Sequence, residues 1–262
     1  MKILLVNPEV PNTFWSLKNA LKFVSKKALL PPLGLLTVAA ILPESFEKKL
    51  IDMNIAPLRD CDIKWADYVF ISTMMIQKDS AQIIISRCNK LNVKVVAGGP
   101  LFTSFPDLIT GCSHLVLNEA EITLPLFLED LASNSLKPVY RTNAKANMKT
   151  SPAPSWDLAD IKKYGQLGLQ FSRGCPFDCD FCDVTNIFGR RVRTKATAQI
   201  IAELEIIHKL KWRGEVFFVD DNFIGKRMKL KKELLPAIIE WMDKRNRPFA
   251  FNTQTSIDLV DD

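Results

Sequence analysis

The chain has 262 residues, of which 47% are apolar and 24% are charged, and its formal net charge is +6. This length allows one large or two ordinary domains, and this composition is typical of a soluble globular protein. The longest apolar run, residues 28–42, is too short to span a bilayer and is interrupted by Pro31, Pro32 and Gly34.

The amino terminus does not have the pattern of a signal peptide, because its first apolar stretch ends at Asn7 and Pro8. Six cysteines without such a signal indicate reduced thiols and metal binding rather than disulfides, which predicts a cytoplasmic location. The basic surplus is modest and lacks interleaved aromatics, so a nucleic-acid partner is not expected.

The first part of the chain alternates between short apolar runs and stretches with apolar residues at helical spacing. Strands are predicted at 2–6, 48–55, 68–75, 93–100 and 114–121, and helices at 33–43, 78–91 and 122–133. Strands separated by helices indicate a parallel sheet with helices on both faces. Ligands of such sheets bind beyond the carboxyl ends of the strands. We therefore predict an α/β domain over residues 1–135, with its binding loops after these strands.

Residues 136–164 are polar, contain Pro152 and Pro154 and lack periodicity, so they are predicted to form an interdomain linker. Strands are predicted again at 168–172, 215–221 and 249–255, with helices at 196–210 and 229–244, the second kinked or restarted at Pro236. This is the start of a second β-α-β-α-β domain, 165–262. Its three strands would leave an open, unpaired edge, which predicts an amino-terminal fragment of a longer protein.

Cys175, Cys179 and Cys182 form a C-x-x-x-C-x-x-C triplet in the run RGCPFDCDFCDV, with Phe181 directly before the third thiol. Iron–sulfur clusters are normally held entirely by cysteine. Three thiolates can bind three irons of a 4Fe–4S cluster and leave the remaining iron open to an exchangeable ligand. The triplet therefore predicts a cluster with one open iron.

A structural zinc site is the alternative interpretation of the triplet. Zinc takes four protein ligands, usually as pairs of Cys or His. His114 and His208, the two histidines of the chain, are far from the triplet in sequence. One of Asp178, Asp180 or Asp183 would therefore have to complete the site. Because a site of three cysteines and one aspartate is unusual, the cluster is favoured.

The triplet with its aromatic residue resembles the signature of the radical S-adenosylmethionine (SAM) enzymes, and the whole chain resembles those members that bind cobalamin. The resemblance rests on PPLGLLTVAA, VVAGGP and NEAEIT in the first domain and on SRGCPFDCDFCD and FFVDDNF in the second. Asn118 departs from the pattern, because many members have Gly there. The stretches FVDDNFIG and FNTQTSIDL are similar to the hopanoid 2-position methylase subgroup.

This resemblance implies a Rossmann-like cobalamin-binding domain followed by the first part of a partial (β/α)6 radical SAM barrel. It also implies roles for single residues. Cys175, Cys179 and Cys182 would bind the 4Fe–4S cluster. SAM contacts are implied for Phe181, Asp220, Asp221, Asn222, Gln254 and Thr255, and cobalamin contacts for Gly98, Gly99, Pro100, Glu119 and Glu121.

Local structure offers an alternative explanation for most of these residues. Gly98 and Gly99 also suit a strand-to-helix turn. Residues 220–222 also suit a helix N-cap, and Glu119 and Glu121 are also acids that favour the first turn of a helix. These alternatives stay open at the level of the sequence.

The two histidines are predicted to have packing roles. The chain lacks a D-x-H-x-x-G motif, which in some cobalamin domains supplies a histidine to the cobalt. Cobalamin is therefore expected to bind without a histidine ligand, with His114 at the start of a strand and His208 at the edge of an apolar helix face. The basic amphipathic stretch 16–27 is predicted to be a surface helix or loop, with peripheral contact to anionic lipid as the alternative.

The implied activity is methyl transfer to an unactivated carbon of a small molecule or a hopanoid-like lipid. In this chemistry SAM cleavage yields a 5′-deoxyadenosyl radical, and cobalamin delivers the methyl group. A low-potential electron donor such as ferredoxin or flavodoxin would reduce the cluster. The alternatives are a non-methylating radical SAM cyclase or rearrangement enzyme and, in a different class, a non-catalytic cobalamin- or zinc-binding module.

Overall fold

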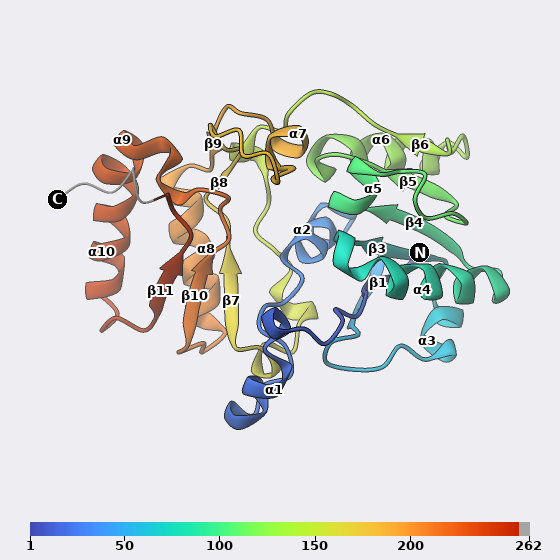
Figure 1. Ribbon diagram of the computed structural model, residues 1–262, viewed down its shortest axis with the longest axis horizontal. Helices are drawn as coiled ribbons and strands as arrows, with labels where there is room; N and C mark the ends of the chain where they lie inside the picture. Colours follow the sequence, from blue (N-terminus) through green and yellow to red (C-terminus); the bar gives the residue numbers. More distant parts are fainter. Residues whose placement is uncertain (257–262) are drawn as a thin grey trace. The chain divides into compact units, whose positions relative to one another are not determined.

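The computed structural model describes residues 1–256, apart from the side chain of Trp15 (Figure 1). The chain forms two compact units. The first contains residues 1–146 and 154–164, and the second contains residues 147–153 and the chain from Gly165 on. Among residues 1–256, no helix is both long and apolar enough to cross a membrane.

The first unit is built on a six-stranded sheet with the order β2-β1-β3-β4-β5-β6, in which every pair of neighbours is parallel. The strands are β1 (Lys2–Asn7), β2 (Glu47–Asp52), β3 (Tyr68–Ser72), β4 (Lys94–Gly98), β5 (His114–Val116) and β6 (Val139–Tyr140). The sheet and its helices confirm the predicted α/β class. The order reverses between β1 and β3, which is the point where parallel sheets of this kind open a crevice for ligands.

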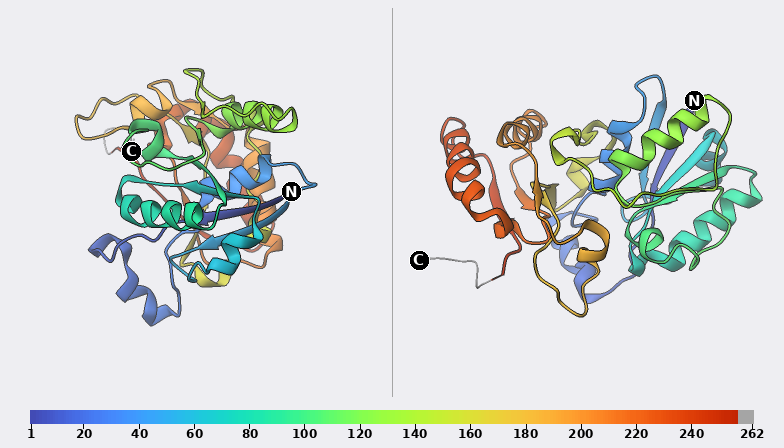
Figure 2. Two further views of the ribbon diagram at one scale, coloured as in Figure 1. Left: turned by 90° about the vertical axis from the view of Figure 1, so that its right-hand side faces the viewer. Right: turned by 90° about the horizontal axis from the view of Figure 1, so that it is seen from above.

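Helices cover both faces of this sheet because side chains of β1 alternate between them. Leu4 and Val6 pack on one face with α3 (Asp60–Trp65), α4 (Lys78–Lys90) and α5 (Pro100–Ser104). Ile3 and Leu5 pack on the other with α2 (Leu33–Ile41) and α6 (Ala120–Ala132). Figure 2 shows α4 and α6 on opposite sides of the sheet.

Short helical turns connect these elements. In the first unit they are η1 (Phe14–Ser16), α1 (Lys18–Leu21), η2 (Lys22–Val24), η3 (Met75–Gln77), η5 (Trp156–Leu158) and η6 (Ile161–Lys163). In the second unit they are η4 (Met148–Thr150), α7 (Val184–Phe188), η7 (Phe223–Lys226) and α9 (Arg227–Lys229). These turns span few residues, so they lack the apolar periodicity that predicted the longer helices.

The segment predicted as an interdomain linker, residues 136–164, contains regular structure. It contributes β6 to the sheet, and Tyr140, Trp156 and Tyr164 are buried at 4%, 3% and 0% exposure. Residues 147–153 instead pack with the second unit, where Gln199 Nε2 donates to the carbonyls of Met148 and Ser151. Polar composition and prolines predicted a linker, but three buried aromatics supply the apolar area that fixes this segment in place.

The second unit contains a parallel three-stranded sheet with the order β11-β10-β7. Its strands are β7 (Gln166–Leu169), β10 (Glu215–Phe218) and β11 (Ala250–Thr253), connected through α8 (Thr197–Lys209) and α10 (Leu235–Asp243). The second helix begins with a π-turn, η8 (Leu230–Leu234), and α10 starts anew with Pro236 in its first turn, as the sequence predicted.

A small antiparallel pair, β8 (Ser172–Arg173) and β9 (Arg193–Thr194), lies between β7 and α8 in the sequence. The cysteine triplet occupies the chain between these two strands. The sequence did not predict this pair, because two-residue strands have no readable alternation. It closes the cysteine loop at its base.

Candidate cofactor-binding sites

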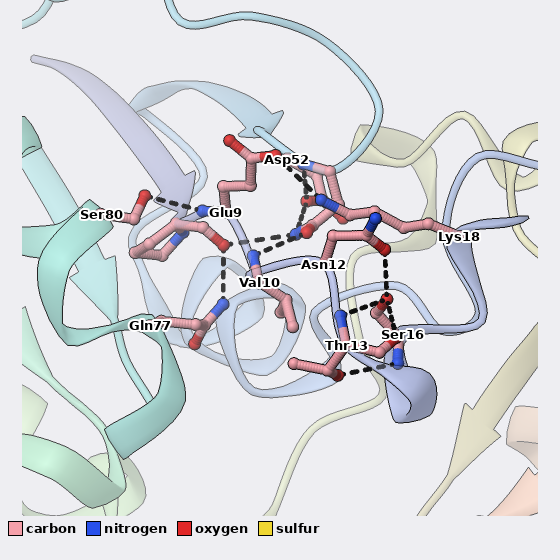
Figure 3. Close-up of polar contacts among 11 residues, drawn as sticks. Glu9, Val10, Asn12, Thr13, Ser16, Lys18, Asp52, Gln77 and Ser80 are labelled. Carbon is pink, nitrogen blue, oxygen red and sulfur yellow. Dashed lines mark hydrogen bonds and ion pairs between the residues drawn. The ribbon is translucent and has the colours of Figure 1, made fainter.

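The loops at the switch point of the first unit are held by a buried polar network (Figure 3). Gln77, which is 2% exposed, donates its Nε2 to the carbonyl of Pro8 at 2.7 Å and to Asn7 Oδ1 at 3.2 Å. Its Oε1 accepts the backbone N–H of Met74 at 3.0 Å. The loops after β1 and β3 are therefore fastened to each other, and their backbone shape is set before any ligand binds.

Asp52 continues this network at the end of β2. Its Oδ1 accepts hydrogen bonds from Asn7 Nδ2 at 3.0 Å and from the backbone and side-chain nitrogens of Asn54 at 2.9 and 2.7 Å. Its Oδ2 accepts the hydroxyl of Tyr164 at 2.9 Å. Burial and the neighbouring Asp52 carboxylate raise the pKa of Tyr164, so this hydroxyl remains a donor. Sequence reasoning missed this network, although a polar residue ending a strand beside a predicted rim was a usable signal for Asp52.

Gly98, Gly99 and Pro100 form the turn from β4 into α5. Gly99 has a φ of 90°, and a Cβ there would lie 2.5 Å from Ser72 Oγ and 2.8 Å from the Thr73 nitrogen. A Cβ on Gly98 would lie 2.6 Å from the carbonyl oxygen of Val116. Both glycines are thus required by close approach to the neighbouring strands. Whether they also allow a ligand to approach stays a prediction.

The turn after β5 places Asn118 and Glu119 on the same edge of the sheet. Asn118 has a φ of 66°, a left-handed conformation that Gly adopts freely and Asn tolerates. This explains why Asn can stand where many relatives of the predicted class have Gly. Glu119 is 3% exposed, its Oε1 accepts the Ala146 N–H at 3.2 Å, and it is the N-cap residue of α6. Glu121 lies in the first turn of α6 and is partly exposed.

In the part of the chain that the structure describes, two buried polar atoms on this edge have no hydrogen-bond partner. They are Thr73 Oγ1, at the end of β3, and Asn118 Oδ1, at the end of β5. Buried polar groups are nearly always paired, so an unpaired pair of oxygens at the ligand edge of a Rossmann-like sheet fits a bound group that supplies donors. Cobalamin carries amide side chains, and Thr73 and Asn118 are suitable partners for them. Thr73 was not among the predicted site residues.

The histidines lie in packing positions. His114 is 9% exposed, its Nδ1 is 2.7 Å from the Lys137 carbonyl oxygen, and its ring packs against Phe127 at 5.6 Å between centroids. His208 packs edge-on against Trp241 at 5.9 Å. These are the two histidines of the chain, and a cobalamin site without a histidine ligand stays a prediction.

The cysteine triplet lies in the loop between β8 and β9 of the second unit. Gly174, with a φ of 95°, opens the loop, and a Cβ there would lie 2.8 Å from the carbonyl oxygens of Gly189 and Arg191. Cys175 donates its N–H to Gly189 O at 3.2 Å, and Cys182 donates to Cys179 O at 3.0 Å. The loop therefore folds back on itself and keeps the three thiols within one short segment.

The three thiols differ in exposure. Cys179 is exposed, while Cys175 and Cys182 are half-buried. Burial raises the pKa of the Cys175 thiol, and the charges of Asp221, Cys182 and Cys179 add to this, while a backbone N–H from Phe177 opposes it. Phe181 is 93% exposed. Within residues 1–256, no three Cys, His, Asp or Glu side chains converge on one point as they would around a bound metal ion. The ligand set Cys175, Cys179 and Cys182 stays a prediction.

Asp220, predicted to contact SAM, has a different task in the structure. It is 1% exposed, its Oδ2 accepts the Phe171 N–H at 3.0 Å, and its Oδ1 accepts the N–H and hydroxyl of Ser172. Burial raises its pKa to about 6, although these donors oppose the shift. Its oxygens are therefore taken up by the strand that leads into the cysteine loop. In the structure Asp220 is thus a positioning residue for this loop, and its contact with SAM stays a prediction.

Asp221 remains a suitable cofactor contact. Its carboxylate accepts the Gly174 N–H, and Arg173 lies close enough to lower its pKa, although burial raises that pKa overall. Its Oδ2 is buried and has no hydrogen-bond partner among residues 1–256. An unpaired carboxylate oxygen beside the cysteine loop fits the amino group of SAM. The geometry thus separates two adjacent aspartates that the sequence treated alike.

The remaining predicted SAM residues gather at the ends of β10 and β11. Asn222 is 3% exposed and donates its Nδ2 to Ser256 Oγ at 2.9 Å. Thr255 Oγ1 lies 3.5 Å from Asn222 Oδ1. Gln254 and Thr255 are exposed, and the Gln254 carbonyl accepts the Phe223 N–H at 3.1 Å. The structure brings these three residues together at one sheet edge, as the strand order requires.

A buried ion pair supports the return of the chain from the cysteine loop. Lys195 Nζ lies 2.5 Å from Glu203 Oε1, and the two side chains are 4% and 3% exposed. Burial raises the pKa of Glu203, with Lys195 opposing the shift. Lys229 Nζ donates to the Lys195 carbonyl at 2.9 Å, and Lys195 N donates to Phe171 O at 2.8 Å. The sequence did not predict this pair, because its members are eight positions apart and charged residues such as Lys and Glu are normally exposed.

No family model matches the chain. An uncharacterized methyltransferase of Synechocystis is 44% identical over 264 residues, which cover 100% of this chain and 49% of that protein. The hopanoid C-2 methylase of Rhodopseudomonas palustris is 34% identical over 248 residues, which cover 93% of this chain and 47% of that protein. The chain therefore spans about half the length of the curated relatives that it matches.

Among solved structures, the radical SAM methyltransferase TsrM of Kitasatospora setae, with tryptophan and a SAM analogue bound, matches with a TM-score of 0.65 at 17% identity. The match covers 94% of this chain and 52% of TsrM. Over the matched region the fold is thus that of TsrM: a Rossmann-like unit followed by a second α/β unit with a parallel sheet. In sequence the chain is similar to methyltransferases that include the hopanoid C-2 methylase, as the sequence motifs predicted.

Proposed function

We propose that this chain is the cofactor-binding part of a cobalamin-dependent radical SAM methyltransferase. The observation that carries the proposal is the loop with Cys175, Cys179 and Cys182, which follows the first strand of a parallel sheet in a chain that also contains a Rossmann-like unit. Support comes from the methyltransferase relatives and from TsrM, one structure of which holds cobalamin and a 4Fe–4S cluster.

When bound, the cluster and SAM would supply the reductive cleavage of a carbon–sulfur bond, and cobalamin would supply the methyl group. The residues of this chain would bind and orient these groups. Cys175, Cys179 and Cys182 would hold the cluster, and Asp220 would fix the root of their loop. Asp221, with its unpaired oxygen, would accept the amino group of SAM.

Further SAM contacts are proposed for Phe181, which is exposed beside the thiols, and for Asn222, Gln254 and Thr255 at the neighbouring strand ends. In the first unit, Thr73 and Asn118 would bind cobalamin amides.

Gly98, Gly99 and Pro100 would shape the edge that cobalamin approaches. Glu119 and Glu121 would flank that edge at the start of α6.

The proposed substrate is a hopanoid-like lipid, with another small molecule as the broader class, because the hopanoid C-2 methylase is among the relatives. The proposed electron donor is a low-potential ferredoxin or flavodoxin, and reduced thiols suit a cytoplasmic setting.

Anaerobic reconstitution of the full-length protein tests the cluster. We expect about four irons and four sulfides per chain and visible absorbance of a 4Fe–4S cluster. Replacing any one of Cys175, Cys179 or Cys182 by Ala should abolish both, while Cys61→Ala, an exposed and isolated cysteine, should leave both unchanged. Uptake of zinc with no cluster would reject the proposal in favour of a zinc module.

Methyl transfer is tested separately with SAM labelled on its methyl group. Appearance of the label in a hopanoid or another small molecule supports methylation. SAM cleavage with an unlabelled, rearranged product would identify the enzyme as a cyclase or rearrangement enzyme instead. The Cys61→Ala protein is again the matched control.

A further inference from the structure

A lysine-rich segment, residues 14–27, follows the rim loop of β1 and consists of η1, α1 and η2. Leu17 and Ser25, with φ of 50° and 56°, divide it into short turns. Figure 1 and both views of Figure 2 show this blue segment standing away from the six-stranded sheet of its unit. We propose that it docks the protein on an anionic lipid surface.

The segment presents apolar side chains to solvent. Phe14, Phe23 and Val24 are 80%, 91% and 61% exposed. Leu21, by contrast, is 6% exposed and serves as the anchor of the segment, and its carbonyl accepts the Lys26 N–H at 2.9 Å. Transfer of a large apolar side chain out of water lowers the free energy. Three such side chains exposed within eleven positions therefore indicate that they insert into an apolar phase.

The charge of the segment is of one sign. Lys18, Lys22, Lys26 and Lys27 lie within it, and the chain has no acidic residue between Glu9 and Glu44. Lys18 pairs with Glu9 at 2.9 Å.

More lysines lie beside the segment. Lys26 Nζ donates to the Lys162 carbonyl at 3.0 Å, and Lys27 N donates to that of Lys163 at 2.8 Å, which brings the two lysines of η6 alongside. The exposed Lys22, Lys27 and Lys162 therefore place positive charge within the segment that carries the apolar residues and beside it.

The segment is held in shape by the body of its unit (Figure 3). Thr13 and Ser16 cap η1 reciprocally, with Ser16 N donating to Thr13 Oγ1 at 3.3 Å and Thr13 N donating to Ser16 Oγ at 3.2 Å. Lys27 Nζ donates to the Ile55 carbonyl at 3.1 Å. A preshaped surface loses little conformational freedom on docking.

Exposed aromatic and aliphatic residues on a segment that also carries several lysines match the boundary between headgroups and acyl chains of an anionic bilayer. A second copy of the chain fits less well, because a symmetric contact would bring the same lysines against each other. The proposal rests on the first unit alone. Its failure would leave methyl transfer untouched, because the two are measured by different assays.

The test is co-sedimentation of the full-length protein with vesicles of phosphatidylcholine, with and without phosphatidylserine. We expect binding that requires the anionic lipid and weakens as the salt concentration is raised, because salt screens the attraction between the lysines and the anionic headgroups. Each exposed lysine replaced by Gln should weaken binding about fivefold, which corresponds to about 1 kcal/mol, so Lys22→Gln with Lys162→Gln should weaken it about 25-fold. Phe23→Ser with Val24→Ser should abolish binding.

Matched controls come from the second unit. Ile239, at 57% exposure, resembles Val24, and Lys231 and Lys232 are exposed lysines of η8. Ile239→Ser and the double change of these lysines to Gln should leave vesicle binding unchanged. The proposal would be overturned if control and test variants lost vesicle binding equally. It would also be overturned if the wild-type protein bound equally well to vesicles with and without phosphatidylserine.

Depth of insertion gives a second readout. In a Phe23→Trp protein, vesicles with bromine-labelled acyl chains should quench the fluorescence more strongly than they do in the wild type. An equal degree of quenching contradicts the proposal. Light scattering that shows a wild-type dimer and a Phe23→Ser monomer would also contradict it, because a second copy of the chain would then cover the segment.

Discussion

The buried pair of Lys195 and Glu203 makes a sharp test of how the cysteine loop is supported. Glu203→Gln keeps the shape of the side chain but leaves the ammonium of Lys195 buried without its counter-charge. Breaking a buried ion pair in this way costs about 3–5 kcal/mol. Both side chains are at most 4% exposed, so solvent screening reduces this cost little. We expect local destabilisation of the return strand β9 and of α8.

Hydrogen–deuterium exchange read out on residues 193–207 measures this cost directly. A loss of about 3–5 kcal/mol should speed exchange by roughly a hundred- to several thousand-fold, since each 1.4 kcal/mol is about tenfold. The control is Glu240→Gln in the exposed pair with Lys244, whose side chains are 68% and 66% exposed, and no measurable change is expected there.

The double change of Lys195→Met with Glu203→Leu should recover most of the loss, because an apolar pair of similar volume often replaces a buried ion pair without cost. Exchange in the Glu203→Gln protein at the wild-type rate would refute the reasoning. It would show that the Lys195 charge reaches water despite its burial.

Further predictions concern single residues. Gly99→Ala should lower the free energy of unfolding by about 2 kcal/mol or more, from left-handed strain and the clash with Thr73; a urea midpoint equal to wild type would contradict this. Tyr164→Phe should cost about 1–3 kcal/mol, because an oxygen of Asp52 loses its donor, and should speed amide exchange at Asn54. Asp220 has a folded pKa of about 6, above its unfolded value, so its contribution to stability is full below about pH 4 and is lost as pH rises through 6, by up to about 3 kcal/mol. Urea midpoints of the Asp220→Asn protein should lack this fall between pH 4 and 7, and parallel pH profiles for both proteins would argue against it.

The strands and long helices could be predicted from the sequence, because each buries a continuous apolar run or face. The four consecutive buried residues of β1, Ile3 to Val6, are all 0% exposed, as expected of a central parallel strand covered on both faces. The similarity to radical SAM methyltransferases could also be predicted, because a short cysteine motif with fixed spacing is readable in the sequence.

The supporting contacts could not be predicted, because their partners are far apart in the chain. Tyr164 and Asp52 are separated by 112 positions, and no local pattern joins them. The same holds for Asp220, whose partners Phe171 and Ser172 precede it by 49 and 48 positions. From the sequence, its place after a strand suggested a cofactor contact, and only the structure shows that its buried oxygens accept hydrogen bonds from the strand before the cysteine loop.

The adjacent aspartates at the end of β10 show how one short stretch can serve both fold and chemistry. Successive residues of an extended chain point to opposite sides, so Asp220 can turn inward to the strand before the cysteine loop while Asp221 faces the loop. The inward carboxylate fixes the backbone from which Gly174 and Cys175 start. The outward one accepts the Gly174 N–H and still keeps one oxygen unpaired. The two aspartates therefore cannot replace each other. Asp221→Asn should leave the fold intact, whereas Asp220→Asn should disturb it.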